Sequence, residues 1–179
     1  PLYRLVAPLH SEAQQPAAEA APRGGSVAAL ERPSAPSVAV LPFTVLGSSE
    51  QTAMLADGLT EDIITDLSQN GWLFVIARNS SFSYKGQTLP SKQIAAELGV
   101  RYLVEGSVRR LGDELRVSAE LVDADSGTQQ WSQRYDRPVS DLFAVQDEIT
   151  RGIVASLGSE IRRAESKRAR QADPDTLEA

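Results

Sequence analysis

The sequence has 179 residues, 41% of them hydrophobic, and a formal net charge of −6. This length and composition predict one soluble domain with tails, and the acidic balance argues against nucleic-acid binding by the domain as a whole. There is no cysteine, and His10 is the single histidine, which excludes disulfides, thiolate metal sites, cysteine nucleophiles and histidine-dependent triads.

The first 36 residues divide into two parts. Residues 1–9 contain a short apolar piece with strand character, which we interpret as the end of a preceding effector domain. Residues 10–36 are rich in Ala, Pro, Gly, Glu and Gln and have almost no large apolar side chain. Such a segment cannot bury enough surface to offset the entropy of ordering, so it is predicted to be a disordered linker. Because the chain begins at Pro1, we expect it to be a fragment of a longer protein.

An α/β domain is predicted over residues 37–165. The apolar run from Val38 to Phe43 predicts a buried first strand. A helix is predicted from about 51 to 69, ended by Asn70-Gly71 in a left-handed cap. Its apolar face consists of Leu59, Ile63, Ile64 and Leu67. The carboxylates Glu61, Asp62 and Asp66 lie mostly off that face, which favours a solvated surface over an acid–base site.

The stretch from Trp72 to Gly86 combines a predicted strand with a polar loop. The apolar run Leu73–Ala77 predicts a second strand buried on both faces. The polar side chains that follow are Arg78, Asn79, Ser80, Ser81 and Lys85. Because α/β proteins tend to place binding sites where a buried strand ends, these residues are candidates for contact with a ligand or partner. The alternative is that they only satisfy backbone groups at a strand end.

The next elements predict a change from parallel to antiparallel pairing. A helix is expected from about 90 to 98, with Pro90 in its first turn and Gly99 as its C-cap. Alternating apolar residues then predict strands over 102–110, 115–121 and 129–135, and the short turns between them require an antiparallel meander. The turn D-A-D-S-G at 123–127 lacks the later ligands and closing glutamate of a calcium loop.

A long helix is predicted from about Asp141 past Ala164, with Ser140 as its N-cap. Its apolar stripe consists of Leu142, Val145, Ile149, Ile153, Leu157 and Ile161. Its far end is basic, with Arg162, Arg163, Lys167, Arg168 and Arg170. We interpret this end as solvated rather than phosphate-binding, because no aromatic residues are interleaved. Residues 166–179 are expected to be a connector to another domain. The fold class is two-layer α/β with a mixed sheet, in the order β-α-β-α-β-β-β-α.

The motifs of common enzyme classes are absent from the sequence. There is no Gly-rich phosphate loop and no G-x-S-x-G elbow. Glu105 is the one strand carboxylate that we expect to be partly buried, and a lone carboxylate without a second acid, a base or a metal makes no mechanism. We therefore predict a non-catalytic segment with no cofactor and no metal. Glu105 and Trp131 are expected as neighbours of the Arg78–Lys85 surface, with plain packing as the alternative role of Trp131.

Five stretches taken together are similar to those of a bacterial family. They are P-S-V-A-V-L-P-F (36–43), A-D-G-L-T-E-D-I-I-T-D-L-S (56–68), W-L-F-V-I-A-R-N-S-S-F-S-Y-K-G (72–86), A-A-E-L-G-V-R-Y-L-V-E-G-S-V-R-R (95–110) and F-A-V-Q-D-E-I-T (143–150). The chain from Pro36 to about Arg163 resembles the TolB amino-terminal-like domain of bacterial multidomain regulators, particularly of rhizobial type. Family members often carry a capping Asp where Pro90 stands, so this helix must begin differently.

The resemblance implies a place in a larger protein. In that family the domain lies between an N-terminal effector and C-terminal tetratricopeptide repeats, and D-P-D-T-L-E-A (173–179) resembles the lead-in to such repeats. The effector is a class III adenylate/guanylate cyclase or a winged-helix DNA-binding domain, and L-Y-R-L-V-A-P (2–8) is similar to the last strand of either. Leu2 stands where the winged-helix pattern has a glycine, which favours the cyclase. No apolar run approaches the roughly 20 residues of a membrane span, which favours a cytoplasmic protein without membrane contact.

Three functions follow from these observations. The first is a non-enzymatic regulatory module that couples binding of a ligand or partner to a cyclase. The second is a spacer or homodimerisation element, in which the stripe from Leu142 to Ile161 would supply the contact between two chains. The third is the sensor domain of a winged-helix transcription regulator. In all three the expected partners are the neighbouring domains of the same chain, and direct contact with nucleic acid is not expected.

Overall fold

The computed structural model describes residues 33–172, which form a mixed sheet of six strands and four helices. The elements are β1 (Ser37–Val40), β2 (Thr44–Leu46), α1 (Glu50–Ser68), β3 (Phe74–Val75), α2 (Arg78–Phe82), α3 (Ser91–Leu98), β4 (Tyr102–Leu111), β5 (Glu114–Asp123), β6 (Thr128–Pro138) and α4 (Leu142–Ala172). The predicted α/β class with a mixed sheet is confirmed. The predictions for residues 1–32 and 173–179 lie outside the described residues.

The sheet changes from parallel to antiparallel pairing at β4. Its strand order is β3-β1-β4-β5-β6, and β2 also pairs with β4. β1 is parallel to both β3 and β4, whereas β4, β5 and β6 form the predicted antiparallel meander. The β4–β5 turn is tight because Gly112 adopts a left-handed φ of 57°. This turn fixes the register of β4 and β5.

The strand predicted over Val38–Phe43 ends at Val40 in the structure, and the strand that follows, β2, was not predicted. β1 and β2 both run parallel to β4, with Val40 opposite Val104 and Thr44 opposite Ser107. Pro42 lies between them and has no N–H to donate to the ladder. The next N–H, that of Phe43, donates to Thr60 Oγ1 at 3.1 Å instead of to a strand. The chain therefore leaves the ladder at Pro42 and returns to β4 as β2.

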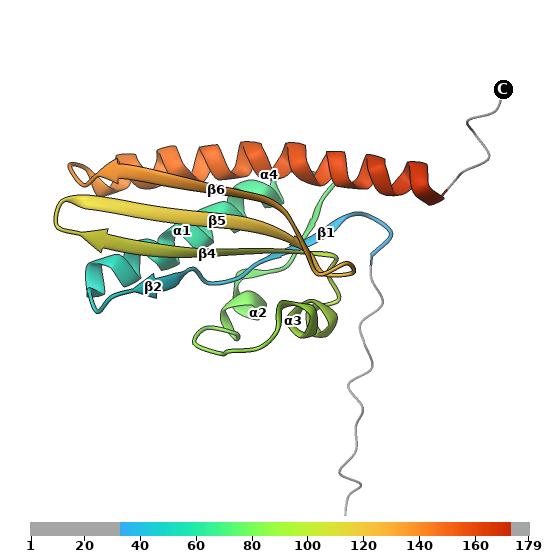
Figure 1. Cartoon of the computed structure of the whole chain (residues 1–179), viewed down its shortest axis with the longest axis horizontal. Coiled ribbons are helices and arrows are strands. Elements are labelled where there is room, and N and C mark those ends of the chain that lie inside the picture. The colour runs from blue at the N-terminus through green and yellow to red at the C-terminus, as the bar shows by residue number, and fades with distance from the viewer. Residues whose placement is uncertain (1–32, 173–179) are drawn as a thin grey trace, which may run out of the picture.

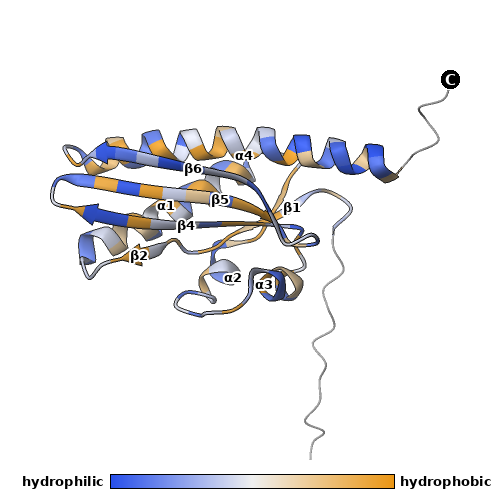
Figure 2. Cartoon of the chain, viewed as in Figure 1, coloured by the Kyte–Doolittle hydropathy of each residue, from blue (hydrophilic) through white to orange (hydrophobic). Residues whose placement is uncertain are grey.

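Helices α1 and α4 cover one face of the sheet and enclose the main core (Figure 1). The predicted stripes of both helices are confirmed, because the residues from Leu59 to Leu67 and from Val145 to Ile161 on those stripes are buried. The helices approach closely where Gly58 lies against the side chain of Gln146, whose Nε2 is 2.9 Å from the place a Cβ would occupy. Figure 2 shows apolar residues alternating with polar ones along the strands and α4. This pattern places the core between the helices and the sheet.

Two predicted helix caps are wrong. The α1 C-cap, Gln69, is right-handed with φ of −72°, and Gly71 is not among the glycines with positive φ. The side-chain amide of Asn70 instead donates to the carbonyl of Leu67 at 3.3 Å, so no left-handed residue is needed. At α4, Asp141 rather than Ser140 caps the helix, because its Oδ1 accepts from the N–H groups of Phe143 and Ala144 at 3.1 and 3.2 Å.

The second predicted strand is also shorter and more exposed than expected. Only Phe74 and Val75 pair with β1, and they form an edge of the sheet, with Phe74 48% exposed. The run Leu73–Ala77 is therefore not a strand buried on both faces. The residues expected as a polar loop form the short helix α2, which begins directly after Ala77. A strand at the edge of a sheet needs only one apolar face. A continuous apolar run therefore does not show by itself that a strand is buried on both faces.

The opposite face of the sheet is covered only near its α3 end. There Ile94 and Ala95 of α3 bury Ala39, Leu41 and Leu103 in a second, smaller cluster. Gly99 ends α3 with the predicted left-handed φ of 67°, while Pro90 is the N-cap rather than a residue of the first turn. The remainder of this face, formed by β4, β5 and β6, has no helix over it (Figure 1).

Candidate functional site

A groove of about 1070 Å³ lies on the part of the sheet face that α3 leaves open. One wall is the segment 84–89 between α2 and α3, and another is the β1–β2 connection around Pro42. The floor comes from the three meander strands. Its polar side chains are Glu105, Ser107, Ser118, Glu120, Ser132 and Arg134. Cavities of this size typically hold small molecules or short peptide segments.

The floor is built as cross-strand rows, because residues directly opposite in a sheet share one face. Glu105 of β4 lies opposite Glu120 of β5, and Glu120 lies opposite Ser132 of β6. The next row joins Ser107 to Ser118. Leu121 and Ala119 alternate with these residues and belong to the core on the other side. The strand period thus separates a buried face from a polar one.

Two carboxylates that face each other dominate the electrostatics of the groove. Burial and the nearby charge of Glu105 raise the pKa of Glu120 above its ordinary range. Glu105 accepts a hydrogen bond from the hydroxyl of Ser91, the first residue of α3, at 2.7 Å. Neither carboxylate forms an ion pair within residues 33–172. The groove therefore contains negative charge that its own cations do not neutralise.

The wall formed by residues 84–89 is anchored by the side chains of its first two residues. Lys85 Nζ donates to Asp57 of α1 at 2.7 Å, which ties the wall to the first helix. The hydroxyl of Tyr84 donates to Glu97 of α3 at 2.7 Å. Burial and this contact with Glu97 raise the pKa of Tyr84 to about 12, so the phenol stays a donor at neutral pH. The wall is thus held between α1 and α3.

The structure separates the predicted contact residues. Lys85 and Glu105 both line the groove. Arg78, Asn79 and Ser80 lie on α2 outside its lining, and Arg78 forms an ion pair with Glu61 of α1 at 3.0 Å. The guanidinium of Arg78 also lies 4.1 Å from the ring centre of Phe82. The ion pair links α2 to α1, and the side chain of Glu61 remains 55% exposed, as expected for a solvated helix face.

Ser81 and Trp131 do not line the groove. Ser81 is fully buried, and its hydroxyl has no hydrogen-bond partner in the described part of the chain. Trp131 lies opposite Leu121 and packs against the main core, on the face that α4 covers. Glu105 and Trp131 therefore lie on opposite faces of the sheet. Trp131 has the packing role that the sequence left open.

Sequence reasoning missed most of the groove floor. The missed residues are Ser107, Ser118, Glu120, Ser132 and Arg134. In each strand these residues alternate with residues of the opposite face. By itself, this alternation indicates a half-buried strand and not a binding site. The signal was present, because the polar half of an alternating pattern in neighbouring strands gathers on one face.

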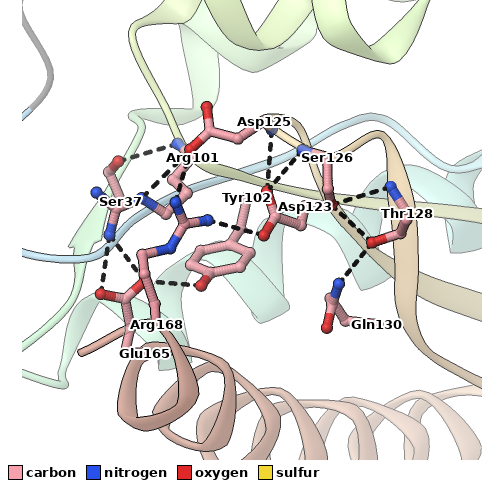
Figure 3. A network of polar contacts seen from close by, with 10 residues as sticks. All are labelled: Ser37, Arg101, Tyr102, Asp123, Asp125, Ser126, Thr128, Gln130, Glu165 and Arg168. Atoms are coloured by element: carbon pink, nitrogen blue, oxygen red, sulfur yellow. Dashed lines mark hydrogen bonds and ion pairs between the residues drawn. The ribbon is translucent and has the colours of Figure 1, made fainter. Parts of the chain in front are cut away.

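A second polar cluster holds the end of α4 against the sheet (Figure 3). Arg101 Nη1 lies 2.8 Å from both carboxylate oxygens of Glu165, and the hydroxyl of Tyr102 donates to the same carboxylate at 2.7 Å. Arg168 donates to Asp123 at 2.8 Å and to Asp125 at 3.0 Å. Burial and the hydrogen bond to Glu165 raise the pKa of Tyr102. We call these six residues the α4 clamp.

At the basic end of α4, Arg163, Lys167 and Arg170 are exposed as expected, whereas Arg168 and Arg162 contact other elements. Arg168 is engaged by two carboxylates, and Arg162 lies over the ring of Trp72 at 4.6 Å. Asp123 also accepts from the backbone N–H groups of Asp125 and Ser126, as the turn interpretation of D-A-D-S-G requires.

Within residues 33–172, no group of three or more His, Cys, Asp or Glu side chains is arranged to hold a metal. None of the described helices has the length and apolar character needed to cross a membrane.

Comparison with known proteins gives both a family match and more distant likenesses. The model of the TolB amino-terminal domain matches residues 31–130. "Putative adenylate cyclase 3" of Rhizobium meliloti is 51% identical over 136 residues, which are 76% of this chain and 23% of that protein. TolB from Acinetobacter baumannii has a TM-score of 0.45 at 18% identity, covering 71% of this chain and 29% of that one. The lipoprotein GNA1162 from Neisseria meningitidis has a TM-score of 0.49 at 17% identity, covering 66% and 96%.

Proposed function

Because the chain belongs to the TolB amino-terminal domain family, we propose that it is a non-catalytic regulatory module of a larger bacterial signalling protein. In this proposal the larger protein is an adenylate or guanylate cyclase, and occupation of the groove by a ligand or partner segment changes its output. The supporting observation is the groove of about 1070 Å³, whose two carboxylates form no ion pair within residues 33–172, on the part of the sheet face that α3 leaves open.

The cyclase assignment is supported by the Rhizobium meliloti relative. That protein is named an adenylate cyclase, and this chain spans about a quarter of its length, with 23% covered. The activity therefore belongs to the whole protein in this proposal, and this segment regulates it. The cytoplasmic location, the flanking effector and the tetratricopeptide repeats are parts of the same proposal.

A route from the groove to neighbouring domains is supported by the arrangement of β4 and β5. Both strands supply the groove floor through Glu105 and Glu120. Three positions away, at the start of β4 and the end of β5, both supply the α4 clamp through Tyr102 and Asp123. The described chain begins beside β1 and ends with α4 at this same end of the molecule (Figure 1). A ligand that alters strand packing in the groove would thereby act on the clamp, where the chain continues toward its neighbours.

The competing spacer function needs a surface other than the predicted stripe. The residues from Val145 to Ile161 on that stripe are buried inside the domain, so they are not available to a second chain. A homodimer would have to use another face. The winged-helix alternative differs only in the effector and is separated by assaying the full-length protein for cyclic nucleotide formation.

The test is a concentration series by light scattering combined with a thermal-melting screen against metabolites and short peptides. The regulatory proposal predicts a ligand that raises the melting temperature, with the rise reduced by Glu120→Gln and unchanged by Glu160→Gln on α4. A tight dimer whose melting is indifferent to every compound would contradict it and favour the spacer.

A further inference from the structure

The open sheet face carries three polar rows in a fixed order along the strands. The row of Glu105 and Glu120 is followed by the row of Ser107 and Ser118, and then by Arg109 opposite Arg116. All six residues lie on one face, because each is two positions from the next along its strand. The face therefore changes from acidic to neutral to basic along its length.

Both outer rows consist of like charges placed directly opposite each other, an arrangement that destabilises a sheet. At the basic end, Asp136 is shared, with Arg116 Nε at 2.6 Å and Arg134 Nε at 3.2 Å. Arg109 is exposed and forms no ion pair within residues 33–172. Arg116 and Arg134 thus share Asp136, while Arg109 and the two carboxylates of the acidic row form no ion pair within residues 33–172.

We propose that this face binds a short zwitterionic peptide in extended form. Its ammonium group contacts the row of Glu105 and Glu120, and its carboxylate contacts the row of Arg109 and Arg116. The proposal rests on the regulatory function above and names the class of ligand. The ammonium end of the peptide lies in the groove, and its carboxylate end extends along the same sheet face beyond the groove lining to Arg109 and Arg116. A bound peptide of this orientation reduces the repulsion within both rows at once, which neither a simple cation nor a simple anion does.

The spacing of the rows sets the length of the peptide. The two charged rows are four residues apart on each strand, which corresponds to about 14 Å at about 3.4 Å per residue. An extended peptide of four residues spans about 13–14 Å. A dipeptide spans about 7 Å and reaches only from the acidic row to the serines. The serine hydroxyls of the middle row are donors and acceptors suited to a peptide backbone.

The test is isothermal titration calorimetry on the 179-residue chain. The probes are tetra-alanine with free ends, the same peptide with an acetylated N-terminus, the same peptide with an amidated C-terminus, and dialanine. We expect blocking of either end, or shortening to dialanine, to weaken binding about tenfold or more, because each change removes a charge-assisted contact.

Protein variants test the two rows separately. Glu105→Gln with Glu120→Gln should abolish the preference for a free N-terminus and keep the preference for a free carboxylate. Arg109→Gln with Arg116→Gln should do the reverse. The control is Glu160→Gln with Arg163→Gln, an ion pair within α4 that is remote from the groove and leaves the affinity unchanged. Circular dichroism verifies the fold of each variant.

Equal affinities for free and blocked tetra-alanine, or no binding at millimolar concentration, would overturn the assignment of a zwitterionic peptide. Failure of this assignment is distinguishable from failure of the regulatory function. A substitution that fills the groove and leaves the output of the full-length protein unchanged would contradict the regulatory function, whatever peptides bind.

Discussion

Gly106→Ala is predicted to be one of the most destabilising small substitutions in the domain. Gly106 lies in β4 between two residues of the groove floor, and the ring of Phe43 packs against it from the core side. A Cβ added at Gly106 would lie 2.5–2.7 Å from three ring carbons of Phe43. The ring is 3% exposed and its backbone N–H is bonded to Thr60, so it has little freedom to move.

The magnitude follows from the cost of overpacking a filled core. Such substitutions typically cost 1–3 kcal/mol, and contacts this short favour the upper end, about 3 kcal/mol. For a domain of this size, about 3 kcal/mol lowers the melting temperature by about 6–12 °C. Differential scanning calorimetry or thermal melting followed by circular dichroism measures the change. The shorter side chain in Phe43→Leu should recover part of the loss when it is combined with Gly106→Ala.

Gly71→Ala is the matched control. Gly71 does not have positive φ, and nothing lies within 4 Å of the place its Cβ would occupy. The same substitution there should therefore be neutral, or stabilising by about 0.4–1 kcal/mol through the unfolded chain. If Gly106→Ala and Gly71→Ala melt at the same temperature, the packing of Phe43 on β4 is not as described.

Two further predictions concern carboxylates. The folded-state pKa of Glu120 is raised, so the stability it contributes is fully present below its unfolded pKa of about 4.3 and is lost as the pH rises through the folded value. Glu120→Gln should therefore raise the melting temperature at pH 7 and have a smaller effect near pH 4; an equal gain at both values would refute the raised pKa of Glu120. Glu165→Gln removes charged contacts to Arg101 and Tyr102 and should cost about 1.5–3 kcal/mol, with faster hydrogen exchange in the last turns of α4. Glu160→Gln loses only an ion pair to Arg163 on the same helix and should cost about 0.5 kcal/mol or less; equal losses would argue against the clamp.

The helices and the meander could be predicted because local patterns determine them. Leu59 to Leu67 and Val145 to Ile161 repeat at helical spacing, and Gly99 and Gly112 mark ends that need left-handed backbone. The like-charged pairs on the open sheet face could also have been predicted from the sequence. Glu105 and Glu120 are equally distant from the turn at Gly112-Asp113, as are Arg109 and Arg116, so a tight hairpin places them opposite each other.

The remaining features depend on contacts between distant segments. The return of the chain as β2 requires Thr60 to take the N–H of Phe43 across 17 positions. The pairing of Arg168 with Asp123 depends on where α4 crosses the sheet, which no local pattern specifies. Ser81 is fully buried although its neighbours Asn79 and Ser80 are exposed, so its burial could not be judged from neighbouring polar residues.

The most direct test of the account is the cyclic nucleotide output of the full-length protein when the groove is filled. Ser118→Trp places a large ring on the groove floor, and Ser140→Trp places the same ring at an exposed position before α4. If the groove regulates the output, Ser118→Trp changes the rate of cyclic AMP or cyclic GMP formation by about fivefold or more, which is in the range of allosteric coupling. Ser140→Trp leaves this rate unchanged. Equal rates for the wild type and both variants, in proteins of equal stability, would contradict a regulatory role for the groove.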